Sequence, residues 1–134
     1  MHDHHLGPIA EVVEPGEPHN SGLRMRLWAL DARVTDAAVL TDGEKLRSIL
    51  YQAAHLGSAT VVGEEFCVFP NGAVTGVLVL AQSHLSIHTW PESLLANVDL
   101  LSCGDLPGER VLRAVGRRIG AVDMTVTCMP RGPW

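Results

Sequence analysis

Residues 74–92 read VTGVLVLAQSHLSIHTWPE and contain two strand-like runs separated by a very short link. The first run, Val74 to Leu80, is apolar almost throughout, and the second, His84 to His88, alternates polar and apolar side chains. A link this short leaves no room for a crossover helix, so we expect the two runs to pair as antiparallel strands. The pair predicts a sheet at the centre of the chain.

Further strand-like and helical patterns flank this pair. Alternation predicts strands from Leu23 onward and at residues 59–62, 66–69, 95–101 and 122–128. Helical spacing predicts one helix from a capping box of Thr41 and Glu44 to Gly57, and a second over residues 109–119. The order of elements predicts an α+β fold, with an antiparallel sheet in one layer and two main helices on one face.

The other face of the sheet also needs a cover. The run from Val77 to Leu80 is apolar on both sides of the strand, which is typical of a sheet buried on both faces. The two predicted helices would lie over one face only. We therefore expect a second subunit's sheet to cover the other face.

Length and composition limit the classes of protein to consider. A chain of 134 residues fits one domain, which we place at residues 22–134, behind a flexible N-terminal tail of residues 1–21. The net charge of -5 argues against a nucleic-acid partner, and the sequence holds no apolar run long enough to span a membrane. Three cysteines without paired spacing indicate reduced thiols, and together these features predict a cytoplasmic protein.

Reactive side chains gather between residues 83 and 103. His84 and His88 have a spacing familiar from metal sites, with Glu92 and Cys103 as further candidate ligands. On a strand, however, four residues span about 13 Å, too far for one ion, so we expect no metal. A protease-like triad of Ser83, His88 and Glu92 or Asp99 lacks the glycine-flanked turn of a nucleophilic serine.

The same residues resemble a known family, the short prokaryotic S-adenosylmethionine decarboxylase proenzymes, which cleave themselves to make a pyruvoyl cofactor. The likeness rests on Ser83-His84, on SIHTWPE at residues 86–92 and on Cys103-Gly104. Flanking residues 57–62, 69–76 and 131–132 also match, so the resemblance covers about residues 22–132.

The resemblance implies a role for each central residue. Cleavage between Gln82 and Ser83 would turn Ser83 into a pyruvoyl group that forms a Schiff base with the substrate's amine. His88 would be the processing base, Thr75 the processing hydroxyl and Cys103 the proton donor in decarboxylation. In a straight strand Ser83 and His88 face opposite sides, so these roles require a bend at the scissile bond or a meeting across a turn.

The resemblance also implies a substrate and an assembly. The reaction would convert S-adenosylmethionine to its decarboxylated form and CO2 for polyamine (spermidine) synthesis. Phe69, Trp90 and Glu92 would bind the substrate, and the processed units would pair as a homodimer.

The chain departs from the family pattern in two places. Gln82 stands where the family has a glutamate, and residues 93–95 are Ser-Leu-Leu where the family has aromatic side chains. Two alternatives therefore stay open. The protein could decarboxylate another amino acid, such as ornithine or arginine, or it could be an unprocessed partner subunit without enzyme activity.

Overall fold

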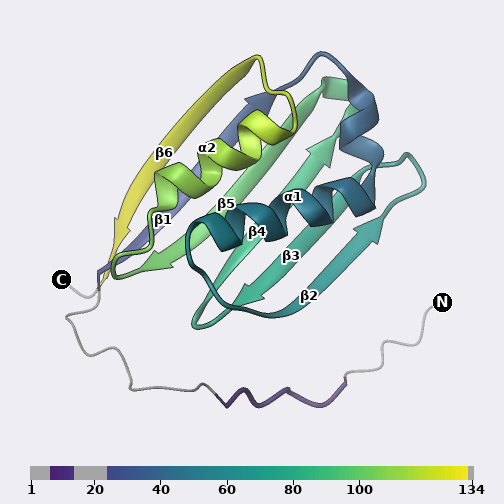
Figure 1. The fold of residues 1–134 in the computed structure, drawn as a ribbon. Helices are drawn as coiled ribbons and strands as arrows, with labels where there is room; N and C mark the ends of the chain where they lie inside the picture. The colour runs from purple at the N-terminus through teal and green to yellow at the C-terminus, as the bar shows by residue number, and fades with distance from the viewer. Residues whose placement is uncertain (1–6, 14–23, 133–134) are drawn as a thin grey trace.

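A six-stranded antiparallel sheet forms the base of the structure, a computed structural model that describes residues 7–13 and 24–132. Its strands are β1 (Met25–Arg33), β2 (Val61–Val68), β3 (Val74–Leu80), β4 (Ser83–Trp90), β5 (Leu95–Cys103) and β6 (Asp123–Arg131). They lie in the order β2-β3-β4-β5-β1-β6 (Figure 1). The predicted antiparallel pairing is therefore confirmed for β2 to β5, with residues 59–62 and 66–69 belonging to one strand region rather than two.

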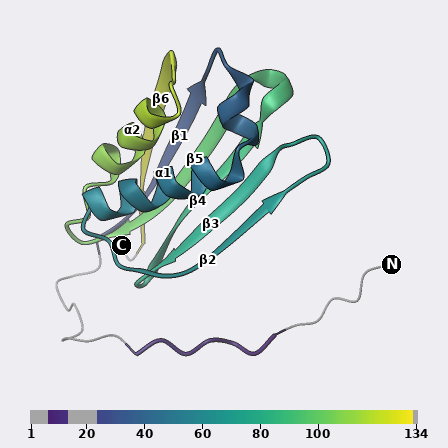
Figure 2. The same cartoon turned by 45° about the vertical axis from the view of Figure 1, so that its right-hand side comes forward.

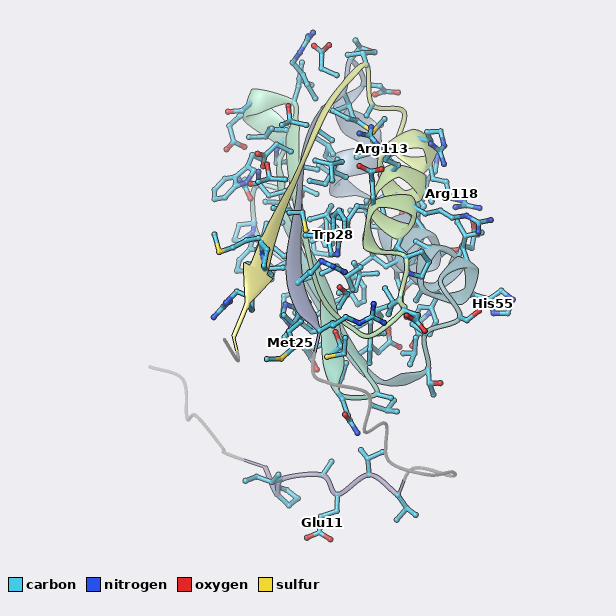
Figure 3. The ribbon with its side chains drawn as sticks, turned by 90° about the vertical axis from the view of Figure 1, so that its left-hand side faces the viewer. Glu11, Met25, Trp28, His55, Arg113 and Arg118 are labelled. Carbon is cyan, nitrogen blue, oxygen red and sulfur yellow. The ribbon has the colours of Figure 1, made fainter. Side chains whose placement is uncertain are left out.

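Two helices, α1 (Gly43–Leu56) and α2 (Gly108–Arg118), lie side by side on the same face of this sheet (Figures 1 and 2). Short 3₁₀ helices, η1 (Ala37–Thr41) and η2 (Pro91–Ser93), precede α1 and follow β4. Viewed along the sheet, the helices occupy one side only (Figure 3). The α+β prediction is confirmed, whereas the cover expected for the open face of the sheet stays a prediction.

The start of α1 differs from the predicted capping box. Asp42 is the N-cap, and its carboxylate accepts from the Lys45 backbone N–H at 3.0 Å. Thr41 instead ends η1, where its hydroxyl donates to the Ala38 carbonyl at 3.1 Å. Because a short helix directly precedes α1, the cap lies one residue later than predicted. The helix ends at Gly57 as predicted.

The two faces of β1 have different surroundings. Leu30 and Ala32 are fully buried beneath the helices, and Trp28 packs against the same core. The alternating row that includes Met25 and Leu27 lies on the open face instead, only partly buried. An apolar row on this face is consistent with a cover that the single chain does not supply.

The core lies between the sheet and the two helices. Its largest fully buried side chains come from every layer: Leu30, Leu40, Leu46, Leu50, Leu78, Leu85, Ile87, Leu100 and Leu112.

A bidentate ion pair also ties α1 to β2, with Arg47 Nε and Nη2 each 2.6 Å from a Glu64 carboxylate oxygen. The hydrogen bonds and charge of Arg47 lower the pKa of Glu64.

The predicted tail falls mostly outside the described residues. Of residues 1–21, the structure describes residues 7–13, all exposed to solvent. Within the described part of the chain, no helix has the length and apolarity needed to cross a bilayer.

Thr89 joins the sheet to η1 through a buried hydroxyl. It accepts from the Val74 N–H at 2.8 Å and donates to the Leu40 carbonyl at 2.7 Å. Both partners are backbone groups of buried residues. Thr89 belongs to the specific motif at residues 86–92, yet its contacts are structural and it points into the core.

Replacing Thr89 tests this structural role. Thr89→Val keeps the shape but removes both hydrogen bonds, so we expect a loss of about 2–4 kcal/mol in the free energy of unfolding. Thr89→Ser keeps the hydroxyl and loses one methyl group, which should cost about 1 kcal/mol. Urea unfolding measures both variants. Equal losses in the two would contradict the role assigned to the hydroxyl.

Candidate functional site

The turn between β3 and β4 holds the predicted cleavage site. Leu80 pairs with Ser83, so only Ala81 and Gln82 connect the two strands. Gln82 has a φ of 58°, in the left-handed region that non-glycine residues occupy at a cost of about 1–3 kcal/mol. The Ala81 N–H donates to the Thr60 carbonyl at 2.9 Å and anchors the turn beside β2. The Gln82–Ser83 peptide bond therefore follows a strained, exposed residue.

Cys103 lies beside this peptide bond because β5 pairs with β4. The pairing of His84 with Leu101 brings the end of β5 next to the start of β4. Cys103 Sγ lies 3.8 Å from the Gln82 carbonyl oxygen, and the Ser83 hydroxyl donates to the Leu101 carbonyl. The half-buried thiol can thus donate a hydrogen bond to the carbonyl that Ser83 would attack.

Thr75 and His88 form a second polar pair, on the open face of the sheet. They are opposite each other on β3 and β4, and Thr75 Oγ1 lies 3.2 Å from His88 Nδ1. Both side chains are half-buried. A hydroxyl at this distance can fix the orientation of the imidazole, so the two residues predicted for processing do lie together.

The structure does not bring His88 to Ser83 within one chain. β4 pairs with both neighbours without a register shift, so it neither bends nor bulges between these residues. Five residues of strand separate them by about 16 Å, on opposite faces. Within the described chain, neither a bend nor a meeting across a turn therefore joins Ser83 to His88.

The predicted substrate-binding residues lie at the far end of the sheet from Ser83. Trp90 ends β4, Glu92 follows in η2, and Phe69 begins the loop after β2. All three side chains are exposed, with Phe69 at 49% and Trp90 at 47% of full exposure. Ser83 and Trp90 stand about 23 Å apart along β4. The predicted site is thus divided between two ends of the sheet.

Two residues that the sequence analysis did not select form a hydrogen-bonded chain with Trp90. The indole N–H donates to Asn97 Oδ1 at 2.6 Å, and Asn97 Nδ2 donates to Asp31 Oδ1 at 2.7 Å. These side chains extend the polar row of Thr75 and His88 across β5 and β1. The one signal in the sequence is polar Asn97 alternating with apolar neighbours, which does not reveal a partner on another strand.

No metal site is evident in the described part of the chain. Within residues 7–13 and 24–132, no three histidine, cysteine or acidic side chains lie close enough to hold an ion.

Comparisons with known proteins identify related sequences. The family model for S-adenosylmethionine decarboxylase matches residues 26–132. A relative from Symbiobacterium thermophilum, named S-adenosylmethionine decarboxylase proenzyme, is 48% identical over 75 residues, or 56% of this chain and 57% of the relative. One of the same name from Caldanaerobacter subterraneus is 40% identical over 99 residues, or 72% of this chain and 79% of the relative.

A solved structure has the same fold. The adenosylmethionine decarboxylase from Aquifex aeolicus matches with a TM-score of 0.76 at 28% identity, covering 85% of this chain and 95% of that one. The first curated relatives are matched over a little more than half of their own length. The family model nevertheless spans most of the chain, and the chain belongs to the S-adenosylmethionine decarboxylase family.

Proposed function

We propose that this chain cleaves itself between Gln82 and Ser83 and then decarboxylates S-adenosylmethionine with a pyruvoyl group made from Ser83. The observation that carries the proposal is the 3.8 Å contact between the Cys103 thiol and the Gln82 carbonyl, at a strained turn. Membership of the family supports the same assignment. The product would enter polyamine (spermidine) synthesis.

Self-cleavage begins at the Ser83 hydroxyl. Its oxygen attacks the Gln82 carbonyl carbon, the peptide C–N bond breaks, and the proton moves to the released nitrogen. The carbonyl oxygen gains negative charge during the attack, and the nearby Cys103 thiol can donate to it. The product is an ester between the Gln82 carboxyl and the Ser83 side chain.

The ester is then broken by β-elimination. A base removes the Ser83 α-proton while the Cβ–O bond breaks, which frees the Gln82 carboxylate and leaves dehydroalanine at the new N-terminus. Addition of water releases ammonia and gives the pyruvoyl group. This group is no larger than the serine that it replaces, so we expect the start of β4 to accommodate it.

The pyruvoyl group supplies an electron sink for the decarboxylation. The chain's own residues must hold the substrate and return a proton to its carbon. Cys103 suits the second task because its thiol is half-buried and lies against the same peptide bond. The proposal therefore gives Cys103 two tasks, one in cleavage and one in turnover.

A second copy of the chain would complete the site. Apolar side chains on the open face come from four strands: Met25, Leu27, Val79, Leu95, Leu101 and Met129. Val79 and Met129 are about half exposed, at 47% and 54%. Packing two such faces together, with sheets about 10 Å apart, would bury this row in a homodimer.

The symmetry of such a dimer accounts for the divided site. A twofold axis that runs across the strands, between the two sheets, reverses the ends of one sheet relative to the other. His88 and Thr75 of one copy would then face the Gln82–Ser83 peptide bond of its partner, beside which Cys103 lies on the open face, while the Ser83 side chain itself points to the other face. The same arrangement would place Trp90, Phe69 and Glu92 beside the partner's pyruvoyl group.

The residues at this far end suit an adenosyl ligand. The faces of Trp90 and Phe69 can stack on adenine or contact the sulfonium, and the Glu92 carboxylate can accept from ribose hydroxyls. These three side chains remain accessible in the single chain. Ornithine and arginine offer neither a flat ring nor a ribose for them to bind.

Release of CO2 tests the activity. Purified protein should release labelled CO2 from carboxyl-labelled S-adenosylmethionine, and Ser83→Ala should release none above background because no pyruvoyl group can form. Ornithine and arginine, assayed in parallel, should give no product. Release from either amino acid without release from S-adenosylmethionine would contradict the proposed substrate.

Mixed dimers test whether His88 acts on the partner chain. We expect Ser83→Ala and His88→Ala to remain uncut when each is made alone. When the two variants are made together, the His88→Ala chain should be cut, because its partner supplies the histidine. His55→Ala, which alters an exposed histidine of α1 that points away from the sheet, is the matched control and should be cut normally (Figure 3).

Two results would contradict this arrangement. Normal cleavage of His88→Ala alone would remove His88 from processing. Failure of the mixed dimers to cut the His88→Ala chain, while both variants still pair, would place the histidine's action within its own chain.

A further inference from the structure

Two hydrogen bonds join side chains of three neighbouring strands on the open face. Trp90 on β4 donates its indole N–H to Asn97 Oδ1 on β5 at 2.6 Å. Asn97 Nδ2 in turn donates to Asp31 Oδ1 on β1 at 2.7 Å. The strand register supports this geometry, because Asn97 and Asp31 are directly paired across β5 and β1.

The chemistry of the three groups fixes the direction of this chain of hydrogen bonds. An indole N–H can only donate, and an ionised carboxylate can only accept. The amide of Asn97 has one acceptor end and one donor end, and only one orientation satisfies both neighbours. Asp31 therefore determines which end of Asn97 faces Trp90.

Trp90 needs such a contact to hold one position. Its side chain lies at the end of β4 and is 47% exposed, so core packing does not fix the ring. The hydrogen bond holds the nitrogen edge of the indole and leaves the ring faces available for a ligand. A ring held in this way loses less conformational freedom when a ligand binds.

We propose that Asn97, oriented by Asp31, is a positioning residue that holds the Trp90 indole for binding of the adenosyl part of the substrate. This inference rests on the proposed function for its ligand. The hydrogen bonds themselves rest on the geometry alone, so the two parts are tested by different measurements.

Nuclear magnetic resonance of the indole N–H groups tests the contact without any assay of activity. The Trp90 signal, identified by its loss in Trp90→Phe, should exchange slowly with solvent in the unsubstituted protein. Asn97→Leu should speed this exchange about tenfold or more, the size expected when a single hydrogen bond is lost. The Trp28 indole, which donates to Ser102 Oγ at 3.0 Å, should be unchanged and serves as the internal reference.

Steady-state kinetics test the consequence for the substrate. In Asn97→Leu we expect KM for S-adenosylmethionine to rise about tenfold, with kcat within about twofold and self-cleavage unchanged. Thr127→Val makes a comparable polar-to-apolar change on β6, on the same face of the sheet, and should leave all three quantities unchanged.

Exchange of the two polar residues provides the rescue. Asn97→Asp alone sets a second carboxylate against that of Asp31 and should raise KM as Asn97→Leu does. Adding Asp31→Asn rebuilds the hydrogen bonds, since the carboxylate introduced at position 97 accepts both from Trp90 and from the amide introduced at position 31. The double variant should return KM to within about twofold of the unsubstituted value, which a general packing defect would not allow.

The outcomes separate the two proposals. Unchanged Trp90 exchange in Asn97→Leu, or failure of the double variant to recover, would overturn the positioning role even in an active enzyme. A cleaved, unsubstituted protein that releases no CO2 from S-adenosylmethionine would overturn the proposed substrate. The exchange measurement would still decide whether Asn97 holds the indole.

Discussion

The alternation of side chains along β4 is the constraint on which the rest of the structure depends. Leu85, Ile87 and Thr89 point into the core, where the first two are fully buried. The alternate residues of the strand consequently point to the open face: His84, Ser86, His88 and Trp90. Because a strand has a period of two, moving any one of these residues would move them all. The fold and the candidate site are therefore specified by the same short strand.

This constraint explains why the candidate residues lie at two ends of the sheet. Antiparallel pairing brings Cys103 to the Gln82–Ser83 peptide bond at one end of the sheet. It also holds His88 with Thr75, and Trp90 with Asn97, toward the other end. A rigid, fully paired strand cannot fold back to unite them. In the proposed dimer, a second copy related by a twofold axis would bring the two ends together and would also cover the apolar open face.

Much of the fold could be predicted from local patterns because each element carries its own signal. The alternation in residues 84–88 and the helical spacing up to Gly57 both appear as expected. The prediction of Thr41 as the cap is wrong because its neighbour Asp42 competes for the same role one residue later. The sequence also did not show which face of β1 is buried, because both of its rows contain apolar residues.

The sequence motif selected candidate site residues but did not give their geometry. Ser83, His88 and Cys103 stand within or close to a specific motif, yet only the strand register reveals which of them meet. Asn97 and Asp31 lie 66 positions apart in the sequence and become neighbours only when β5 pairs with β1.

The central claim, cleavage at the turn after Gln82, is tested most directly by the mass of the purified protein under denaturing conditions. The account predicts two chains, residues 1–82 and 83–134, with a pyruvoyl group at the start of the second. A single intact chain of 14.4 kDa, or a cut at another bond, would contradict it.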